Sequence, residues 1–284
     1  MEYHIEQQDI ELLRQAGLAE CDIEHSRRVA EKALEIARRT GADLDLELVG
    51  RGALFHDLGK GVTHAIEHGR IGAELGAKLG LPPAITAIME KHIRGGLSEP
   101  EAVELGLPVK DYTLNRLEER IIIYADRLVD IIHDGIIPLH DEQDAETRFA
   151  EILTTCPKYG KNETTLRRYL GYHEEIQGLI SGRIIDTARL QELLAQGVVS
   201  LLDVRRKADH EAAPRMIPGA TWRDPEQVAQ WGATLPKESR TVIYCVRGGS
   251  VSKTVSEQLR SQGVAVSYLD GGLAAWTGQG NPVA

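Results

Sequence analysis

The chain has 284 residues, the length of one large domain or two ordinary ones, and 42% of them are hydrophobic, enough to bury a core. The formal net charge of −10 argues against a surface for general nucleic-acid binding. No apolar run is long enough to span a bilayer, and the polar start at residues 1–11 is not a signal peptide. We therefore expect a cytoplasmic protein with no membrane partner, and the sequence leaves its oligomeric state open.

The three cysteines, Cys21, Cys156 and Cys245, are too few and too scattered for a disulfide framework. In a reducing compartment such a cysteine is either a core residue or a reactive thiol. Cys21 and Cys156 have no partner nearby in the sequence, so we interpret both as structural. Cys245 lies in a different context and is considered below.

The first 178 residues are predicted to form helices joined by short loops. Asp22 has the residue type of an N-cap for a helix to about residue 39, and Gly41 ends that helix. Later helices are predicted from similar start and stop signals. Their expected ranges are 45–55, 64–79, 83–95, from residue 98 onward, 113–133, 144–155 and 163–180.

After residues 181–182 the pattern changes to short apolar runs separated by helical segments. The predicted strands are 198–204, 241–246 and 264–269, and the predicted helices are 186–196, 224–231 and 250–262. Strands that alternate with helices imply a parallel sheet with helices on its faces. We therefore predict two domains, an all-α bundle at residues 1–180 and an α/β domain at residues 181–284.

A histidine and a carboxylate stand side by side at the end of the apolar run 53–55, as His56 and Asp57. Gly59 and Lys60 follow. Adjacent residues within a helix point about 100° apart, so this pair is better placed at a helix end for binding one ion. Alone, such a pair is a weak signal.

Other imidazoles and carboxylates lie on or beside the apolar stripes of separate predicted helices: His25, His68, His92 and Asp126. Each one alone is more simply a satisfied core histidine or a capping aspartate. Asp126, however, lies within the apolar stretch 121–129, where a carboxylate should be paired or bound to a metal. Together these residue types suit Mn, Fe, Co or Zn held between the helices of a bundle.

With these residues the chain resembles the HD-domain metal-dependent phosphohydrolases over about residues 20–135. The family order of a histidine, a His-Asp pair and a distant aspartate is matched by His25, His56-Asp57 and Asp126. Subfamilies with two metals have two further histidines, which His68 and His92 match. His64, one turn before His68, is an alternative ligand.

The resemblance implies an all-α domain with one or two divalent ions and Asp57 as the natural bridge between them. Such ions activate water and clamp a phosphoryl group. The implied substrate is a small phosphoester or phosphoanhydride, most simply a nucleotide, and the nearest analogy is with bacterial HD hydrolases of symmetrical dinucleoside tetraphosphates. Lys60, and more weakly Arg94, are candidates for binding substrate phosphate; the alternative for both is a solvated loop residue.

Cys245 directly follows the apolar strand 241–244 and precedes the loop Val246-Arg247-Gly248-Gly249-Ser250, after which a helix begins. A strand, a glycine-bearing loop and a helix N-terminus bring backbone N–H groups together and add the positive end of the helix dipole. A cysteine in this position is expected to be a thiolate near neutrality, and Arg247 adds positive charge. The alternative is a buried cysteine at a strand end.

Four stretches in order resemble the single-domain rhodanese sulfurtransferases over about residues 183–280: 201–205, 217–220, 245–250 and 269–276. The resemblance implies that Cys245 carries sulfur as a persulfide. The amides of the loop from Val246 to Ser250 would hold the persulfide or the anion of a donor such as thiosulfate. By the same analogy, Asp203 and Arg205 brace the sheet.

The cysteine loop is the short form suited to sulfur. A cysteine-based phosphatase of related fold needs an arginine six residues after the cysteine, and this chain has Val251 there. The segment 213–215 departs from the usual rhodanese pattern, which leaves the sulfur donor open.

Three functions follow from these patterns. The first is a bifunctional enzyme that joins a metal-dependent phosphohydrolase to a sulfurtransferase. The second is an HD hydrolase controlled by a rhodanese-like module that senses sulfide or redox state or docks a partner. The third, a helical binding module with vestigial metal residues, is weakened because all four core ligand positions are filled.

Overall fold

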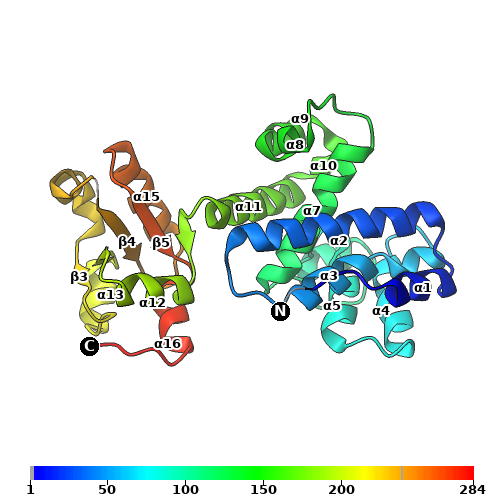
Figure 1. The fold of residues 1–284 in the computed structure, drawn as a ribbon, viewed down its shortest axis with the longest axis horizontal. Helices are drawn as coiled ribbons and strands as arrows, with labels where there is room; N and C mark the ends of the chain where they lie inside the picture. Colours follow the sequence, from blue (N-terminus) through cyan, green and yellow to red (C-terminus); the bar gives the residue numbers. More distant parts are fainter. Residues whose placement is uncertain (1–2, 238) are drawn as a thin grey trace. The chain divides into compact units, whose positions relative to one another are not determined.

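The computed structural model describes residues 3–237 and 239–284, and the chain divides into two compact units, Met1–Ile176 and Gln177–Ala284. Figure 1 shows helices throughout the first unit and a sheet flanked by helices in the second. This architecture confirms the predicted fold class. No helix of the described residues has both the length and the apolarity needed to cross a bilayer.

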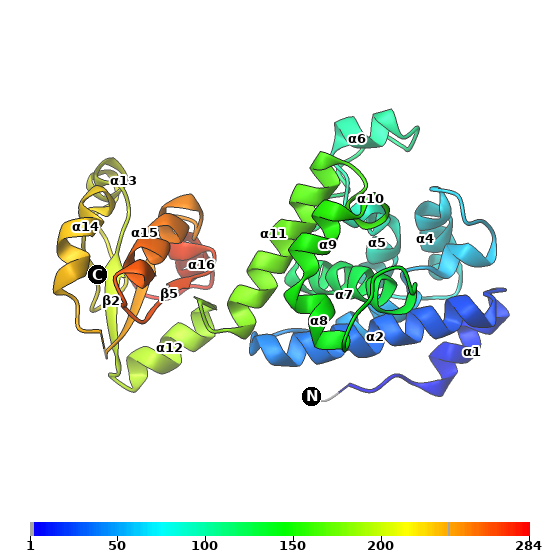
Figure 2. The ribbon, with the colours of Figure 1, turned by 90° about the horizontal axis from the view of Figure 1, so that it is seen from above.

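The first unit is built around three helices that contact one another: α2 (Glu20–Thr40), α3 (Leu46–Phe55) and α7 (Leu117–His133) (Figures 1 and 2). Gly41 ends α2 with φ 65°, a left-handed conformation that glycine adopts without a steric penalty. The prediction that Asp22 caps α2 is wrong, because the helix begins earlier and Ala19 is its N-cap. Asp22 instead lies in the first turn, where its charge suits the helix dipole.

The helices that carry the remaining site residues pack against this core. They are α4 (His68–Lys78), which contacts α5 (Pro83–Lys91), and α5, which contacts α3. Helix α4 was expected from residue 64 but begins at His68, so His64 belongs to the preceding loop. Helix α6 (Glu99–Glu104) begins at the expected place, with a capping box between Ser98 and Glu101.

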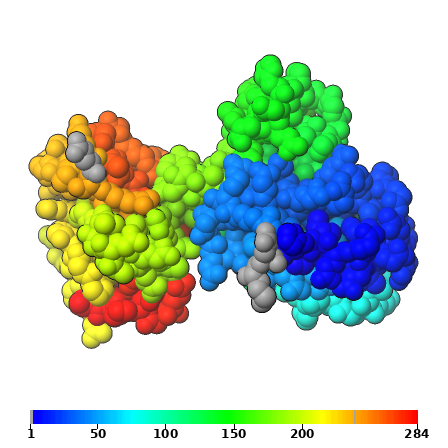
Figure 3. Space-filling view, viewed as in Figure 1, coloured from blue at the N-terminus to red at the C-terminus, as the bar shows by residue number. Residues whose placement is uncertain are grey.

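The segment after α7 is an all-helical lobe. The single helix expected at 144–155 is interrupted at Arg148 into α8 (Glu142–Thr147) and α9 (Phe149–Thr155), which stand out from the rest of the unit (Figures 1 and 3). Short α10 (Pro157–Gly160) and long α11 (Glu163–Ile180) follow. Helix α1 (Gln7–Gln15) was not predicted from the sequence.

The second unit contains a five-stranded parallel sheet in the order β1-β5-β4-β2-β3. The strands are β1 (Ile184–Ile185), β2 (Val199–Asp203), β3 (Thr221–Trp222), β4 (Arg240–Tyr244) and β5 (Val266–Leu269). The three long strands were predicted, whereas β1 and β3 have two residues each and leave no periodicity to detect.

Helices pack on the sheet through apolar side chains. In one core cluster, Leu190 of α12 (Thr187–Ala195) and Trp276 of α16 (Gly272–Gly278) pack with Val242 of β4. Helix α15 (Ser250–Ser261) buries Val255 and contacts β4 and β5. The remaining helices are α13 (Lys207–Ala212) and α14 (Val228–Trp231). Strand β4 is central, so Cys245 follows it at the carboxyl edge of the sheet, where ligands bind in such folds.

A candidate metal centre and a candidate cysteine loop

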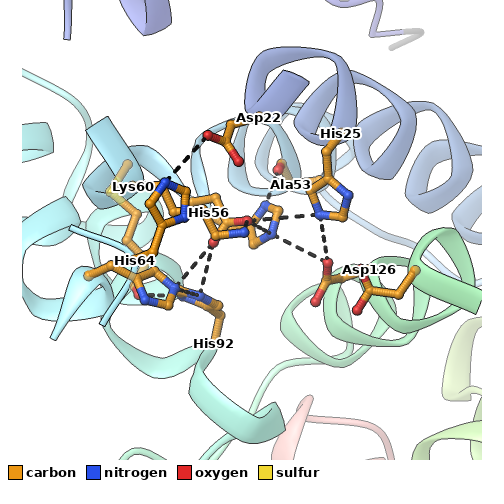
Figure 4. A network of polar contacts seen from close by, with 12 residues as sticks. Asp22, His25, Ala53, His56, Lys60, His64, His92 and Asp126 are labelled. Atoms are coloured by element: carbon orange, nitrogen blue, oxygen red, sulfur yellow. Dashed lines mark hydrogen bonds and ion pairs between the residues drawn. The ribbon is translucent and has the colours of Figure 1, made fainter. Parts of the chain in front are cut away.

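Six side chains from five separate parts of the first unit converge on one site (Figure 4). His25 comes from α2, His56 and Asp57 follow α3, His68 is the first residue of α4, and Asp126 comes from α7. The sixth is His92, the C-cap of α5. The structure therefore brings together every residue that the sequence assigned to a metal, across more than 100 positions of the chain.

The donor atoms form two groups of three, one made by His25, His56 and Asp126, the other by Asp57, His68 and His92. In the first, Asp126 Oδ1 lies 3.0 Å from the Nε2 of His25 and 3.5 Å from that of His56. In the second, Asp57 Oδ1 lies 3.2 Å from the Nε2 of His68 and 3.4 Å from that of His92.

Asp57 joins the two groups because its carboxylate oxygens face different histidines. Oδ1 faces His68 and His92, while Oδ2 lies 3.2 Å from His56 Nε2 and 3.8 Å from His25 Nε2. A carboxylate divided in this way has the arrangement needed to bridge two ions. Asp57 is 3% exposed, so its charge must be compensated inside the protein.

Backbone carbonyls fix the orientation of three of the rings. The Nδ1 atoms lie 2.6–2.7 Å from carbonyl oxygens: His56 from Ala53, His68 from Ala65 and His92 from Met89. A carbonyl can only accept, so each Nδ1 donates its proton, and in a neutral ring the lone pair is on Nε2, which points into the site. Second contacts of this kind are typical of metal-binding histidines.

The distances within the donor set fit a divalent cation. His68 Nε2 and His92 Nε2 are 2.9 Å apart although both are acceptors in the neutral tautomer, so a positive charge is needed between or beside them. Ligands held about 2.1 Å from one ion lie roughly 3.0–3.4 Å from each other, and the distances given above within the two donor groups are 2.9–3.5 Å. Imidazole and carboxylate donors suit Mn, Fe, Co or Zn.

The charges of the site perturb each other strongly. Burial raises the pKa of Asp57, but the charge of the His56 imidazole and the close contacts with His56, His68 and His92 outweigh burial and hold this pKa well below its usual value. Burial lowers the pKa of His56, yet the carboxylates of Asp57 and Asp126 raise it to about 10. Metal binding requires the Nε2 lone pair, so a cation bound there would compete with a proton.

The candidate phosphate-binding residues and the alternative histidine occupy different places. Lys60 Nζ lies 2.5 Å from Asp57 Oδ2, so this lysine faces the site. Arg94 lines the same pocket as the metal donors. The His64 side chain is 69% exposed, and its Nε2 lies 3.9 Å from the Asp22 carboxylate (Figure 4). His68, and not His64, therefore faces the other donors.

The donors open into a pocket of about 330 Å³ that also contains residues absent from the sequence analysis. Asp130 lies one turn after Asp126 on α7, and that spacing was the signal that could have revealed it. Arg127, Lys161 and Tyr169 have no such signal, because they lie in an apolar helix face or beyond it in the chain. The complete lining is His25, Asp57, Lys60, Ile66, His68, His92, Ile93, Arg94, Asp126, Arg127, Asp130, Lys161 and Tyr169.

The cysteine loop of the second unit is shaped mostly by backbone. Cys245 itself is 5% exposed, whereas Val246, Arg247, Gly249 and Ser250 are exposed around it. The loop is anchored to the start of α16, since Leu273 N donates to the Cys245 carbonyl and Ala274 N to the Val246 carbonyl. The N-terminal turn of α15 begins at Ser250, so unpaired amides lie next to the cysteine.

Glycine is required at two positions of this loop and its anchor. Gly248 has φ 64°, and a Cβ there would lie 2.7 Å from the Leu269 carbonyl oxygen. Gly272 has φ 57°, and a Cβ there would lie 2.4 Å from the Cys245 carbonyl oxygen. Both distances are too short for real contacts, so the loop and the β5–α16 turn can approach this closely only without side chains.

Asp203 and Arg205 form a buried pair beside the loop. The Arg205 guanidinium is enclosed, with the residue 1% exposed, and donates to the Asp203 carboxylate and to the carbonyls of Ala213 and Arg215. The segment 213–215, which departs from the usual rhodanese pattern, thus supplies backbone acceptors to the Arg205 guanidinium.

Cys21, which was interpreted as a structural cysteine, is exposed and is not packed in a core.

Comparison with known proteins identifies both units. The HD domain family model matches residues 22–130, and the rhodanese-like domain model matches residues 186–279. An uncharacterised protein of Methanocaldococcus jannaschii, MJ0778, is 37% identical over 165 residues, which are 56% of this chain and 89% of that protein. The Bacillus subtilis protein named "Putative sulfurtransferase YtwF" is 35% identical over 99 residues, 34% of this chain and 93% of that protein.

A third relative matches a smaller share of its own length. The tRNA (cytidine(56)-2'-O)-methyltransferase of Thermoplasma volcanium is 39% identical over 123 residues, 43% of this chain. The matched part spans 36% of that enzyme.

Proposed function

The chain belongs to the HD-domain family through its N-terminal unit and to the rhodanese-like family through its C-terminal unit, and on that premise we propose that it joins two activities. The first is metal-dependent hydrolysis of a small phosphorylated molecule, such as a nucleotide. The second is transfer of sulfur through Cys245.

The observation that carries the hydrolase proposal is the division of the Asp57 carboxylate between two groups of donors. The group around Asp126 would hold one ion and the group around His68 and His92 a second. Ions at these positions supply Lewis-acid activation of water and charge neutralisation of a phosphoryl group. Mn, Fe, Co and Zn all suit this donor set.

The chain's own residues have two tasks in this reaction. The backbone carbonyls hold the histidine rings so that Nε2 faces inward. Lys60, once Asp57 is engaged elsewhere, is free to pair with a substrate oxygen. In the reaction a water oxygen forms a bond to phosphorus, the bond from phosphorus to the leaving oxygen breaks, and the water's proton ends on solvent or the leaving group.

A small molecule suits the site better than a long polynucleotide. The pocket of about 330 Å³ lies at the low end for small-molecule sites. The net charge of −10 opposes the nonspecific attraction that polynucleotides need.

The decisive experiment for the hydrolase is metal analysis of the purified protein, followed by phosphate release from a panel of mononucleotides, nucleoside polyphosphates and dinucleoside polyphosphates. We expect one or two divalent ions per chain and metal-dependent release from at least one class. Absence of stoichiometric metal, with activity unaffected in both His56→Ala and Asp126→Ala, would refute the proposal.

The sulfurtransferase proposal rests on the position of Cys245 between the end of β4 and the free amides of α15. The Cys245 thiolate would attack the outer sulfur of thiosulfate, the S–S bond of the donor would break, and sulfite would leave with the electron pair. A nucleophilic acceptor then removes the outer sulfur from the persulfide and restores the thiolate. Thiosulfate-to-cyanide transfer, measured as thiocyanate, tests this directly, and an inactive wild type would contradict it.

The second candidate, in which the rhodanese-like unit regulates the hydrolase, is favoured by one observation. Cys245 is 5% exposed, an access more suited to slow modification than to rapid turnover. The discriminating measurement is the hydrolase rate before and after persulfidation of Cys245. A changed rate with negligible transfer to cyanide supports regulation, and an unchanged rate with turnover supports two enzymes.

A further inference from the structure

Beside the metal donors, the same pocket contains a second set of cationic groups. Four cations line the pocket, namely Lys60, Arg94, Arg127 and Lys161, against three carboxylates, namely Asp57, Asp126 and Asp130. Two of these carboxylates belong to the metal donor groups, and the third, Asp130, is paired with Arg127 through Nη1 at 3.0 Å. Once ions neutralise Asp57 and Asp126, the pocket has an excess of positive charge.

Two of the cations have no hydrogen-bond or ion-pair partner for their side chains among the described residues. Within residues 3–237 and 239–284, the side chains of Arg94 and Lys161 make no hydrogen bond or ion pair. Most other arginines of this unit are paired with carboxylates, as Arg51 is with Asp9 and Arg120 with Glu175. Two cations that line one pocket and make no ion pair are therefore available to a ligand.

These same two residues have unusual backbones. Among the described residues, Arg94 (φ 49°) and Lys161 (φ 62°) are the non-glycine residues with positive φ. Such conformations cost free energy in residues with a Cβ and persist where the surrounding structure fixes them, often at functional sites. The chain thus places a long cationic side chain at two positions where glycine would be less strained.

Helix α11 holds Arg94 in this conformation. Arg168 Nη1 donates to the Arg94 carbonyl at 3.0 Å, and the Tyr172 hydroxyl donates to the Gly95 carbonyl at 2.9 Å. Arg168 is itself anchored by an ion pair of 2.6 Å with Glu101. The strained turn is therefore held by side chains of α11.

The third basic residue of this pocket, Arg127, is held in place by Tyr169. Arg127 is 7% exposed, donates to the Tyr169 hydroxyl at 3.0 Å and lies over the Tyr169 ring at 4.8 Å. Its guanidinium adds positive potential without needing to reach the ligand. Lys161, Arg168 and Tyr169 all lie beyond residue 130, where the match to the HD family ends.

We propose that Arg94 and Lys161 form a second anion subsite, which binds a further phosphoryl group of the substrate while the first occupies the metal centre. The inference rests on the proposed hydrolase function and narrows it: the substrate is a phosphoanhydride with at least two phosphoryl groups, not a phosphomonoester. When the bridging P–O bond breaks, the leaving phosphate takes the bridging oxygen and its negative charge, and the two cations stabilise it. One residue of this subsite, Lys161, thereby brings a segment beyond the matched HD region into substrate specificity.

The test compares two probes that no hydrolase can cleave, methylphosphonate with one phosphoryl group and methylenediphosphonate with two. Each is titrated by calorimetry into the full chain with free Mn²⁺ in excess. We expect the wild type to bind the diphosphonate at least about tenfold more tightly than the monophosphonate.

The variants are Arg94→Asn and Lys161→Asn, because asparagine tolerates positive φ better than other uncharged residues. Each should weaken diphosphonate binding about tenfold and leave monophosphonate binding within about twofold. Lys161→Arg should retain the preference. Lys158→Asn is the matched control, since this exposed lysine is paired with Asp134 and does not line the pocket.

The outcomes separate the two proposals. Three results would overturn the subsite: the variants lose binding of both probes equally, the variants lose binding of neither probe, or the wild type binds the two probes equally tightly. If the wild type hydrolyses no phosphate compound but its diphosphonate preference depends on Arg94 and Lys161, the hydrolase proposal fails and the anion subsite stands. Thermal midpoints of the variants identify any that do not fold, and Lys161→Gly, which relieves the strain, replaces a misfolded Lys161→Asn.

Discussion

The two sites of this chain are built in opposite ways. The metal centre takes side chains from α2, α3, α4, α5 and α7, and its donor atoms meet only because these helices pack together. The cysteine loop is one strand–loop–helix segment, shaped by backbone amides and by two glycines that permit a close turn. The first should therefore be sensitive to ions and to single charged side chains, the second to single changes of backbone conformation.

The largest expected effect is Cys245→Ser. Because removal of a nucleophile costs several orders of magnitude, thiosulfate-to-cyanide transfer should fall at least about 10⁴-fold. Cys21→Ser is the control, since that cysteine is exposed and belongs to the other unit, and its transfer rate should match the wild type. If the hydrolase activity of Cys245→Ser equals that of the wild type, the two sites act independently. If the hydrolase activity changes, regulation by the rhodanese-like unit is favoured.

Next comes Asp57→Asn, which removes the charge shared by both donor groups. Phosphate release should fall about 10³-fold, and bound metal measured by atomic absorption should decrease. Transfer of sulfur should be unaltered. His64→Ala serves as the control, because its exposed side chain faces away from the donors, and hydrolysis within about twofold of wild type is expected. A larger loss in His64→Ala would contradict the assignment of His68.

A smaller effect is expected from a pair of glycine variants in the cysteine loop. Gly248→Ala places a Cβ 2.7 Å from the Leu269 carbonyl at φ 64°, and should destabilise the unit by at least about 2 kcal/mol and slow sulfur transfer. Gly249→Ala has φ −86° and no heavy atom within 4 Å of the new Cβ, so it should be nearly neutral. Urea unfolding measures the stability of the two variants, and thiosulfate-to-cyanide transfer measures their activity. Equal effects of the two substitutions would show that the positions of the loop amides do not control sulfur transfer.

Metal removal should change the stability of one unit only. An ion present at 100–1,000 times its dissociation constant stabilises the folded state by about 2.7–4.1 kcal/mol. Chelation should thus lower the calorimetric transition of the helical unit and leave that of the α/β unit unchanged, and Zn²⁺ or Mn²⁺ should restore it. A shift of both transitions would mean that the ion acts outside the centre around Asp57.

Much of both units could be predicted from the sequence because the informative residues stand next to each other or within one predicted element. The His56-Asp57 pair at a helix end, the buried carboxylate of Asp126 and the cysteine between a strand and a helix each have a physical reason to stand out. Short β1 and β3 could not be predicted, since two residues carry no periodicity. The early start of α2 escaped because the N-cap is Ala19, which has no capping side chain.

By itself the sequence determined which residues can bind metal and which cysteine can carry sulfur, because charge, burial tendency and chemical type are properties of single residues and their neighbours. Only the tertiary structure decided that His68 rather than His64 faces Asp57, that the two oxygens of Asp57 serve different histidines, and that Lys161 joins Arg94 in one pocket. These depend on where a helix begins and on how distant helices pack, and no local pattern records the position of a distant neighbour.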